Sequence, residues 1–520
     1  MAALLRTSFG SRRSSLARLR LSRQWSYLQR WLLRWELAYS LPAIALLSLN
    51  PDQGLVSAWD LERIPGIPWK YAQTDTSPLT LWLLALLPVI PWIIRYLGPG
   101  KGALVSLHDY SILIYVSGAL VGLVLTWSVS GATTRVLGIL AALYLYYLIW
   151  HTASTPRRLY KWLLGVLGWS AAMALLTLSL LGFSLASSPS ADLVGTTLSA
   201  LSDFALGPLF HLYFFDVTQR VVSNPNGLAD FALVVALISG VIALDRAPRW
   251  RQLAWLLPCL AATWLLLATG SRTAILAGVL SIAYILWRTS QRWLLAIVPV
   301  LMITAGVALI PSQKRTDLLN LWSSTAGVAR LQVWSSYWGL ARESPMVGHG
   351  LGLRSVATAY SRRYGLTLKF TDPHAHNVLL QTLLEQGVLG LAGMLLVVWT
   401  CWRSAEAMRA NAHSDSDSRP ATVALASWAA MLGLLFHALF DIALNSNVGL
   451  VLFFALAALA ARAGSYYHTA TGGVASGELR SDSPGHITLR QAIGATLGVS
   501  FLVAVLSFWP PPLAPHVYVR

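Results

Sequence analysis

The chain has 520 residues, of which 56% are hydrophobic and only 11% are charged, less than half the share of about 25% in soluble globular chains. With a mean hydropathy of +0.58, this composition excludes a soluble globular protein and predicts a multi-pass membrane protein. The charge is basic, with 38 Lys and Arg against 21 Asp and Glu, and two cysteines, Cys259 and Cys401, in or at the end of apolar runs, argue against a disulfide framework or a Cys-based metal site.

The N-terminal segment 1–35 is strongly basic. It contains eight arginines and no acidic residue, which by the positive-inside rule predicts a cytoplasmic N-terminus. Arginines interrupt its apolar stretches, so a cleavable signal peptide is not expected. Residues 17–35 fit either a basic amphipathic helix on the inner leaflet or a disordered basic tail.

Thirteen apolar runs predict an all-α polytopic membrane bundle of about 12–13 spans. Basic loops alternate with less basic ones, which places loops such as 99–104, 152–159, 246–251 and 403–420 in the cytoplasm. The predicted spans are 36–51, 78–98, 105–127, 132–151, 160–184, 228–245, 252–268, 272–288, 293–311, 380–402, 421–440, 447–463 and 491–509.

A long loop at 312–379 falls on the extracytoplasmic side in this topology. It holds eight basic residues against three acidic ones, but long loops translocate largely regardless of charge. The spacing of its apolar residues predicts at least one amphipathic helix packed on the bundle. The residues that show this spacing are Leu331, Trp334, Tyr337, Trp338 and Leu340.

Several short motifs lie in or next to this loop. His374-Ala375-His376-Asn377 is followed after nine residues by Gly387 and then by Gly390. Upstream stand Arg330 with Trp334, the turn Pro345-x2-Gly348-x-Gly350, the element Gly270-Ser271-Arg272 and the segment Asn224-Pro225-Asn226-Gly227.

Taken in chain order, from Asn224 to Gly390, the motifs resemble those of the O-antigen ligase and O-antigen polymerase superfamily of bacterial membrane proteins. The resemblance covers about 205–463 and implies a bundle similar to that of the C-class glycosyltransferases. It divides the chain into a basic cytoplasmic segment (1–35), N-terminal spans (36–204), a ligase-like core (205–463) and a flexible linker with a last span (464–520). It also implies the bacterial inner membrane, lipopolysaccharide or other polysaccharide biosynthesis, and no metal or other cofactor.

The predicted topology places Arg272, Arg330 and His376 on the extracytoplasmic face, where nucleotide sugars are absent. The donor that the family implies is a glycan on undecaprenyl diphosphate. Arginine suits a diphosphate because its planar fork binds phosphate oxygens in pairs. Histidine is suited to proton transfer at physiological pH, so His376 is a candidate for taking the acceptor's proton or for holding a diphosphate oxygen. These three are the predicted catalytic residues.

Further residues are predicted to bind substrate: Asn377, His374, Arg342, His437 and Asp441. His437 and Asp441 are four apart in one predicted span, so we expect them to share a helix face. They either orient substrate or form a structural hydrogen bond between helices, and the same two alternatives apply to Asp230. Each arginine also has a plain alternative, either contact with lipid headgroups or exposure on a helix. A metal site from His374, His376 and Asp372 is a further alternative.

The expected acceptor is a lipid A core sugar for a ligase, a second lipid-linked glycan for a polymerase, or a protein hydroxyl. A non-enzymatic alternative is transport of bicarbonate or another anion. Such a transporter is expected to show paired broken helices and repeat symmetry, and the sequence shows neither.

Overall fold

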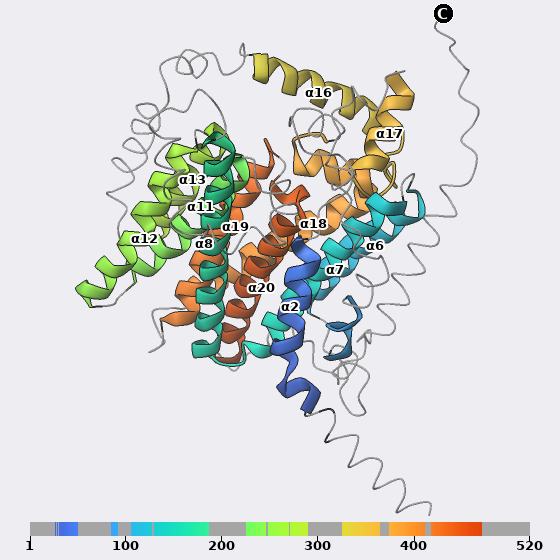
Figure 1. The fold of residues 1–520 in the computed structure, drawn as a ribbon. Coiled ribbons are helices and arrows are strands. Elements are labelled where there is room, and N and C mark those ends of the chain that lie inside the picture. Colours follow the sequence, from blue (N-terminus) through green and yellow to red (C-terminus); the bar gives the residue numbers. More distant parts are fainter. Residues whose placement is uncertain are drawn as a thin grey trace, which may run out of the picture.

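The computed structural model describes thirteen parts of the chain, and the helices in them agree with the predicted all-α fold (Figure 1). In the described residues there is no strand. The described parts are residues 27, 29, 31–49, 85–91, 106–126, 129–186, 225–245, 248–269, 271–289, 325–364, 374–410, 418–441 and 443–470. Of the predicted N-terminal amphipathic helix, only residues 27, 29 and 31–35 are described, and all of these except Trp35 are helical. The spans at 293–311 and 491–509, and most of 78–98, lie outside the described parts.

The bundle helices follow the predicted spans closely. Eight helices in the described residues are long and apolar enough to cross a membrane, so the protein is a multi-pass membrane protein. The bundle consists of α2 (Glu36–Leu49), α6 (Leu107–Val124), α7 (Val129–Thr152), α8 (Pro156–Ala186), α11 (Pro225–Ala243), α12 (Arg249–Ala268), α13 (Arg272–Arg288), α18 (Val378–Ala410), α19 (Arg419–Ala438) and α20 (Asn447–Ala470). Of these, α2 and α13 are shorter than the eight, at 14 and 17 residues.

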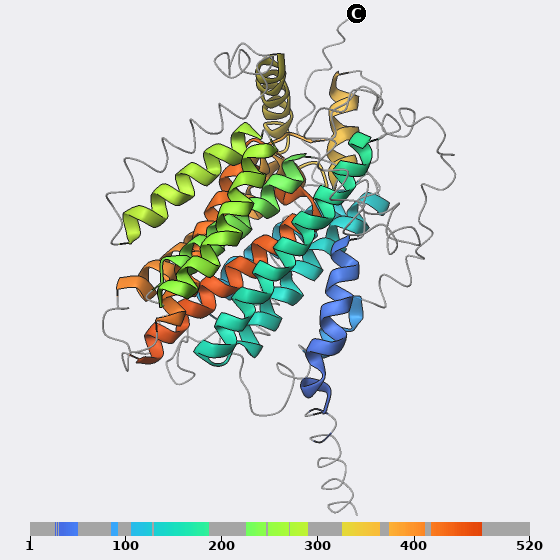
Figure 2. The same cartoon turned by 60° about the vertical axis from the view of Figure 1, so that its left-hand side comes forward.

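Helix α20 forms the centre of the bundle and α12 lies at its edge (Figures 1 and 2). Residues 448–463 of α20 are almost all buried, and six of them are alanine. Small side chains let neighbouring helices approach closely, and α7, α18 and α19 all pack on α20. By contrast, α12 exposes Trp250, Leu257 and Trp264, as expected for a helix that faces lipid.

The longest helix, α18, is broken at Gly387, whose φ of 65° and ψ of −168° are not helical. A turn from the long loop fills the break. The Val388 N–H donates to the Pro345 carbonyl at 2.8 Å, and the His349 N–H donates to the Leu384 carbonyl at 2.6 Å. The predicted Pro-x2-Gly-x-Gly turn and Gly387, which nine residues separate from Asn377, therefore belong to one structural feature.

Two helices of the long loop, α16 (Thr325–Ala341) and α17 (Leu353–Tyr364), lie at one end of the bundle (Figure 1). We call this the α16 end. The inner side of α16 buries Tyr337 and Leu340 in a small apolar cluster with Val356 of α17 and Leu384 of α18, whereas Leu331 and Trp338 remain exposed. The prediction of a helix in this loop that packs on the bundle is thus confirmed.

Candidate functional site

His437 lies at the α16 end and joins three helices through buried hydrogen bonds. Its Nδ1 lies 2.6 Å from Asp230 Oδ1 on α11, and its Nε2 lies 3.4 Å from the hydroxyl of Ser271, the residue before α13. Because Asp230 offers a carboxylate oxygen, Nδ1 is the ring nitrogen that donates in this contact. Because all three side chains are buried, their hydrogen bonds hold α11, α13 and α19 together.

Asp441 lies close by but has different partners. Helix α19 ends at Ala438, so His437 and Asp441 do not share a helix face as predicted; Asp441 lies in the turn that follows. Its carboxylate accepts a hydrogen bond from the Asn226 amide and lies 3.9 Å from Arg330 Nη2. Asp441 is 3% exposed and Arg330 is 36% exposed, so the arginine reaches from a buried anion toward the surface.

The His374–Asn377 loop precedes α18. His376 has φ +48° and is the one non-glycine residue with positive φ in the described part of the chain. Such conformations cost about 1–3 kcal/mol and cluster at functional sites. The rings of His374 and His376 lie 4.1 Å apart. Asn377 caps α18, because its Oδ1 accepts from the Leu380 N–H at 3.0 Å, which gives it a structural role beside the predicted substrate contact.

Helix α16 connects these two parts of the site. Four residues after Arg330, Trp334 packs against Phe440, next to Asp441, with ring centroids 5.9 Å apart. Seven residues after Arg330, Tyr337 packs in the cluster that contains the buried Ala375. Since residues three, four and seven apart lie on one side of a helix, α16 brings Arg330, the Asp441 turn and the histidine loop to the same end of the bundle.

The other predicted arginines lie at the edges of this region. Arg272 is the first residue of α13 and is half-buried, directly after Ser271. Arg342 follows the end of α16, is exposed, and stacks over Trp338 at 5.5 Å.

His349, in the turn that fills the α18 break, is a half-buried histidine outside the spans. Its Nε2 lies 2.8 Å from the Leu340 carbonyl oxygen. Burial lowers the pKa of His349, and the hydrogen bond to Leu340 opposes part of this effect. The imidazole is therefore neutral at pH 7 and ties the turn to the end of α16.

The alternative metal set lies partly outside the described residues, since Asp372 is not among them. Within the described ranges, no three His, Cys, Asp or Glu side chains are grouped as metal ligands would be.

Comparison with known families bears directly on this region. A family model described as O-antigen ligase matches residues 257–395. The chain contains an O-antigen ligase domain. No curated protein matches the chain. The O-antigen ligase domain runs from within α12 into α18, so it includes Arg272, Arg330, Arg342 and the histidine loop. The family assignment made from the motifs is confirmed.

Asp230, His437 and Asp441 lie outside the matched part of the O-antigen ligase domain, yet the fold brings them to it. Asn226, in the predicted Asn-Pro-Asn segment, also lies at this site, because its side-chain amide donates a hydrogen bond to Asp441. The predicted catalytic and substrate-binding roles remain predictions, but the placement of Arg330 beside Asp441 gives that arginine a defined geometry.

Sequence reasoning missed a buried polar set beneath the histidine loop. Arg135 of α7 and Glu385 of α18 form an ion pair at 3.4 Å, with 6% and 1% exposure. Gln381 lies between Glu385 and Ala375. A signal was present, because Arg135 and Glu385 both fall inside predicted spans, where ionised side chains are costly and tend to be functional.

Proposed function

We propose that the protein transfers a glycan from an undecaprenyl-diphosphate carrier to an acceptor hydroxyl at the extracytoplasmic face. The O-antigen ligase domain supports lipid-linked glycan substrates in general. The observation that carries the proposal is the meeting, on α16, of the Arg330–Asp441 pair and the His374–Asn377 loop.

Arg330 is the proposed donor-binding residue. Its side chain is 36% exposed, while Asp441 is buried and also held by Asn226. A separation of 3.9 Å is at the outer limit of an ion pair, so the arginine keeps N–H groups for a ligand. A diphosphate accepts paired hydrogen bonds from such a fork, and the buried carboxylate sets the direction in which the fork points.

His376 is the proposed proton acceptor. In the step, the acceptor hydroxyl oxygen forms a bond to the anomeric carbon while the bond from that carbon to the diphosphate oxygen breaks. The hydroxyl proton passes to His376, and undecaprenyl diphosphate leaves with the electron pair. The diphosphate is a weak base, so the protein has to stabilise its charge and align the acceptor. Arg272, His374, Arg342 and Asn377 are proposed to contact substrate around this centre.

The same chemistry serves a polymerase, in which the acceptor is a second lipid-linked glycan, and metal independence belongs to the proposal. Transport of an anion has one observation in its favour, because α18 is broken at Gly387 and transporters use broken helices. However, backbone groups of the Pro345–Gly350 turn bind those freed by the break, namely Leu384 and Val388. These groups are therefore already bonded and do not face an ion.

The test is transfer in vitro by the purified protein in lipid nanodiscs, with undecaprenyl-diphosphate-linked glycan as donor. Lipid A core, a second lipid-linked glycan and a protein are offered as separate acceptors. General acid-base catalysis contributes a factor of about 10² to 10⁴, so His376→Ala should lose that much activity and His374→Ala less. His151→Ala, at the other end of α7, is the matched control.

Wild-type rates in His376→Ala would remove the proposed base. Activity that a chelator abolishes would revive the metal alternative with His374 and Asp372. Uptake of a labelled anion into vesicles without any transfer would replace the proposed function by transport.

A further inference from the structure

The Arg135–Glu385 pair lies deep in the bundle and has no part in the chemistry proposed above. Removing two charged groups from water is costly, and good geometry with additional hydrogen bonds is needed to offset the cost. Both side chains are more than nine-tenths buried, and both have additional partners. These partners lead in two directions, toward two different parts of the candidate site.

One direction leads to the histidine loop. Glu385 Oε1 accepts from Gln381 Nε2 at 2.8 Å, and Gln381 Oε1 accepts from the backbone N–H of Ala375 at 3.0 Å. Glu385 and Gln381 are four residues apart, so they lie on one face of α18. Ala375 separates His374 from His376, so its backbone position determines where both imidazoles lie.

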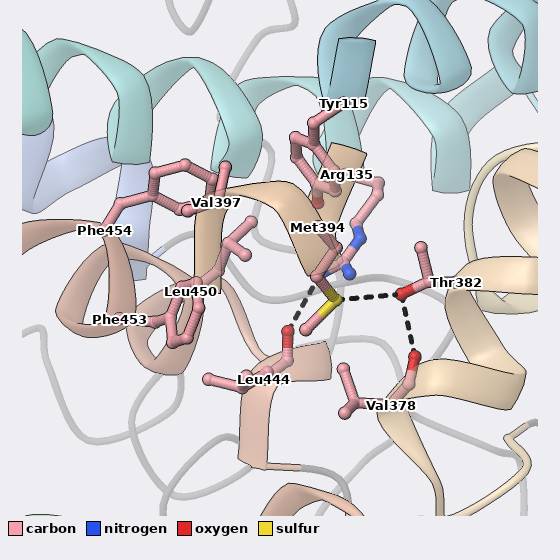
Figure 3. A pocket seen from close by; sticks show the side chains of 10 residues that line it. All are labelled: Tyr115, Arg135, Val378, Thr382, Met394, Val397, Leu444, Leu450, Phe453 and Phe454. Carbon is pink, nitrogen blue, oxygen red and sulfur yellow. Dashed lines mark hydrogen bonds between the residues drawn. The ribbon is translucent and has the colours of Figure 1, made fainter. Parts of the chain in front are cut away.

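The other direction leads to the Asp441 turn. Arg135 Nη1 donates to the carbonyl oxygen of Asn445 at 2.9 Å and lies 3.5 Å from that of Leu444. In Figure 3 the Arg135 side chain extends from α7 across a small pocket toward Leu444. The segment Ala443–Asn447 is further fixed by α7, because the Asn447 amide donates to the Thr134 carbonyl at 3.3 Å.

We propose that Arg135 and Glu385 are positioning residues that fix the histidine loop relative to the turn that holds Arg330. Each acts through other residues, Glu385 through Gln381 and Arg135 through the carbonyl of Asn445. The pair thus supplies a second connection between the two parts of the site, beneath the one that α16 makes at the surface. This inference rests on the proposed function for its kinetic consequences, but not for its structural ones.

The branched arrangement predicts different kinetic effects for its members. Gln381→Leu releases only the histidine loop, so kcat for glycan transfer should fall about 100-fold, as expected for a misplaced catalytic group, while the KM for the donor stays unchanged. Arg135→Met releases the Asp441 turn as well, so kcat falls and the donor KM rises. Arg135→Lys should not rescue, because one ammonium group cannot reproduce the arginine's fork.

Loss of folding is controlled by a double variant and by a matched ion pair. Replacing both members of a buried pair by apolar residues is often neutral for stability, so Arg135→Met with Glu385→Leu should restore the melting temperature but not kcat. Arg288 and Glu406 form an ion pair at 2.5 Å between α13 and α18, toward the other end of α18. The corresponding double variant there should change neither kcat nor KM.

Hydrogen exchange provides a readout that does not depend on activity. In Arg135→Met, amides in both 374–377 and 443–447 should exchange at least tenfold faster, whereas Gln381→Leu should affect only 374–377, including Ala375. Unchanged exchange in both segments, or full kcat in the apolar double variant, would overturn the positioning role. If the wild-type protein transfers no glycan while the two variants show the predicted changes in exchange, only the proposed function is refuted and the positioning role stands.

Discussion

Replacement of Gly387 by alanine tests how the break in α18 shapes the site. At φ 65° and ψ −168°, Gly387 has a backbone conformation that is essentially restricted to glycine. A methyl group added there would overlap the Met346 carbonyl oxygen and would lie 2.5 Å from the Val347 nitrogen. Both neighbours are backbone atoms of the turn that fills the break, so neither can move aside as a flexible side chain would.

The expected cost of Gly387→Ala has two contributions. The unfavourable backbone conformation costs about 1–3 kcal/mol, and overpacking against fixed neighbours costs about 1–3 kcal/mol more. The free energy of unfolding should therefore fall by about 2–6 kcal/mol. The glycan-transfer rate should also fall at temperatures where the variant is still folded, because a displaced turn also displaces Leu384 and the α18 segment that follows the histidine loop.

The assay is thermal unfolding of the purified protein in one detergent, together with the glycan-transfer rate well below the melting temperature. Gly165→Ala is the matched control, because Gly165 lies inside α8, has a helical conformation, and a methyl group there would meet no atom within 4 Å. That variant should gain up to about 1 kcal/mol from helix propensity. A Gly387→Ala protein as stable and active as Gly165→Ala would refute the reasoning.

Three further predictions follow from individual contacts. Arg330→Lys keeps the charge but loses the fork, so donor KM should rise about tenfold or more. Arg354→Lys, at an exposed arginine, is the control. A donor KM in Arg330→Lys equal to that of the wild type would show that Arg330 acts only through its charge. Asn226→Ala removes a hydrogen bond to the Asp441 carboxylate and should raise donor KM in the same direction; an unchanged KM would separate that carboxylate from donor binding. Burial lowers the pKa of His349 below its ordinary value of 6.5, so unfolding takes up a proton and the free energy of unfolding should fall as pH drops below about 6.5. In His349→Gln the melting temperature should therefore depend less on pH in this range. The same pH dependence in both proteins would contradict this prediction.

The spans and α16 could be predicted because they depend on local composition. Runs of apolar residues long enough to cross a bilayer gave helix positions close to those observed. Of the five apolar residues that suggested the packed side of α16, Tyr337 and Leu340 are buried, whereas Leu331 and Trp338 are exposed. The end of α19 was misjudged, because hydropathy continues through Leu439 and Phe440 although the helix ends at Ala438. Apolar character alone does not distinguish a last helical turn from a buried turn after it.

Contacts between distant segments could not be predicted in the same way. The motifs identified Arg330 and His376 as candidates. By contrast, no sequence pattern predicts the contact between Arg135 and Glu385, which are 250 positions apart. Their pairing depends on how α6, α7 and α18 pack, which is set by close contacts such as that between Gly118 and Gly390. The burial of Asp230 with His437 likewise becomes visible only when α11 and α19 are placed side by side.

The turn in the α18 break also limits how a bulky substrate can enter. Pulling the turn out would deprive the backbone groups of Pro345, His349, Leu384 and Val388 of their partners together, and polar groups buried without partners are costly. The C-terminal end of α16 is therefore anchored to α18, and opening requires rotation about this anchor. The end of α16 that carries Arg330 is held by side-chain contacts with Phe440 and Asp441, which can separate without exposing backbone groups, so we expect a lipid-linked chain to reach the site from that side.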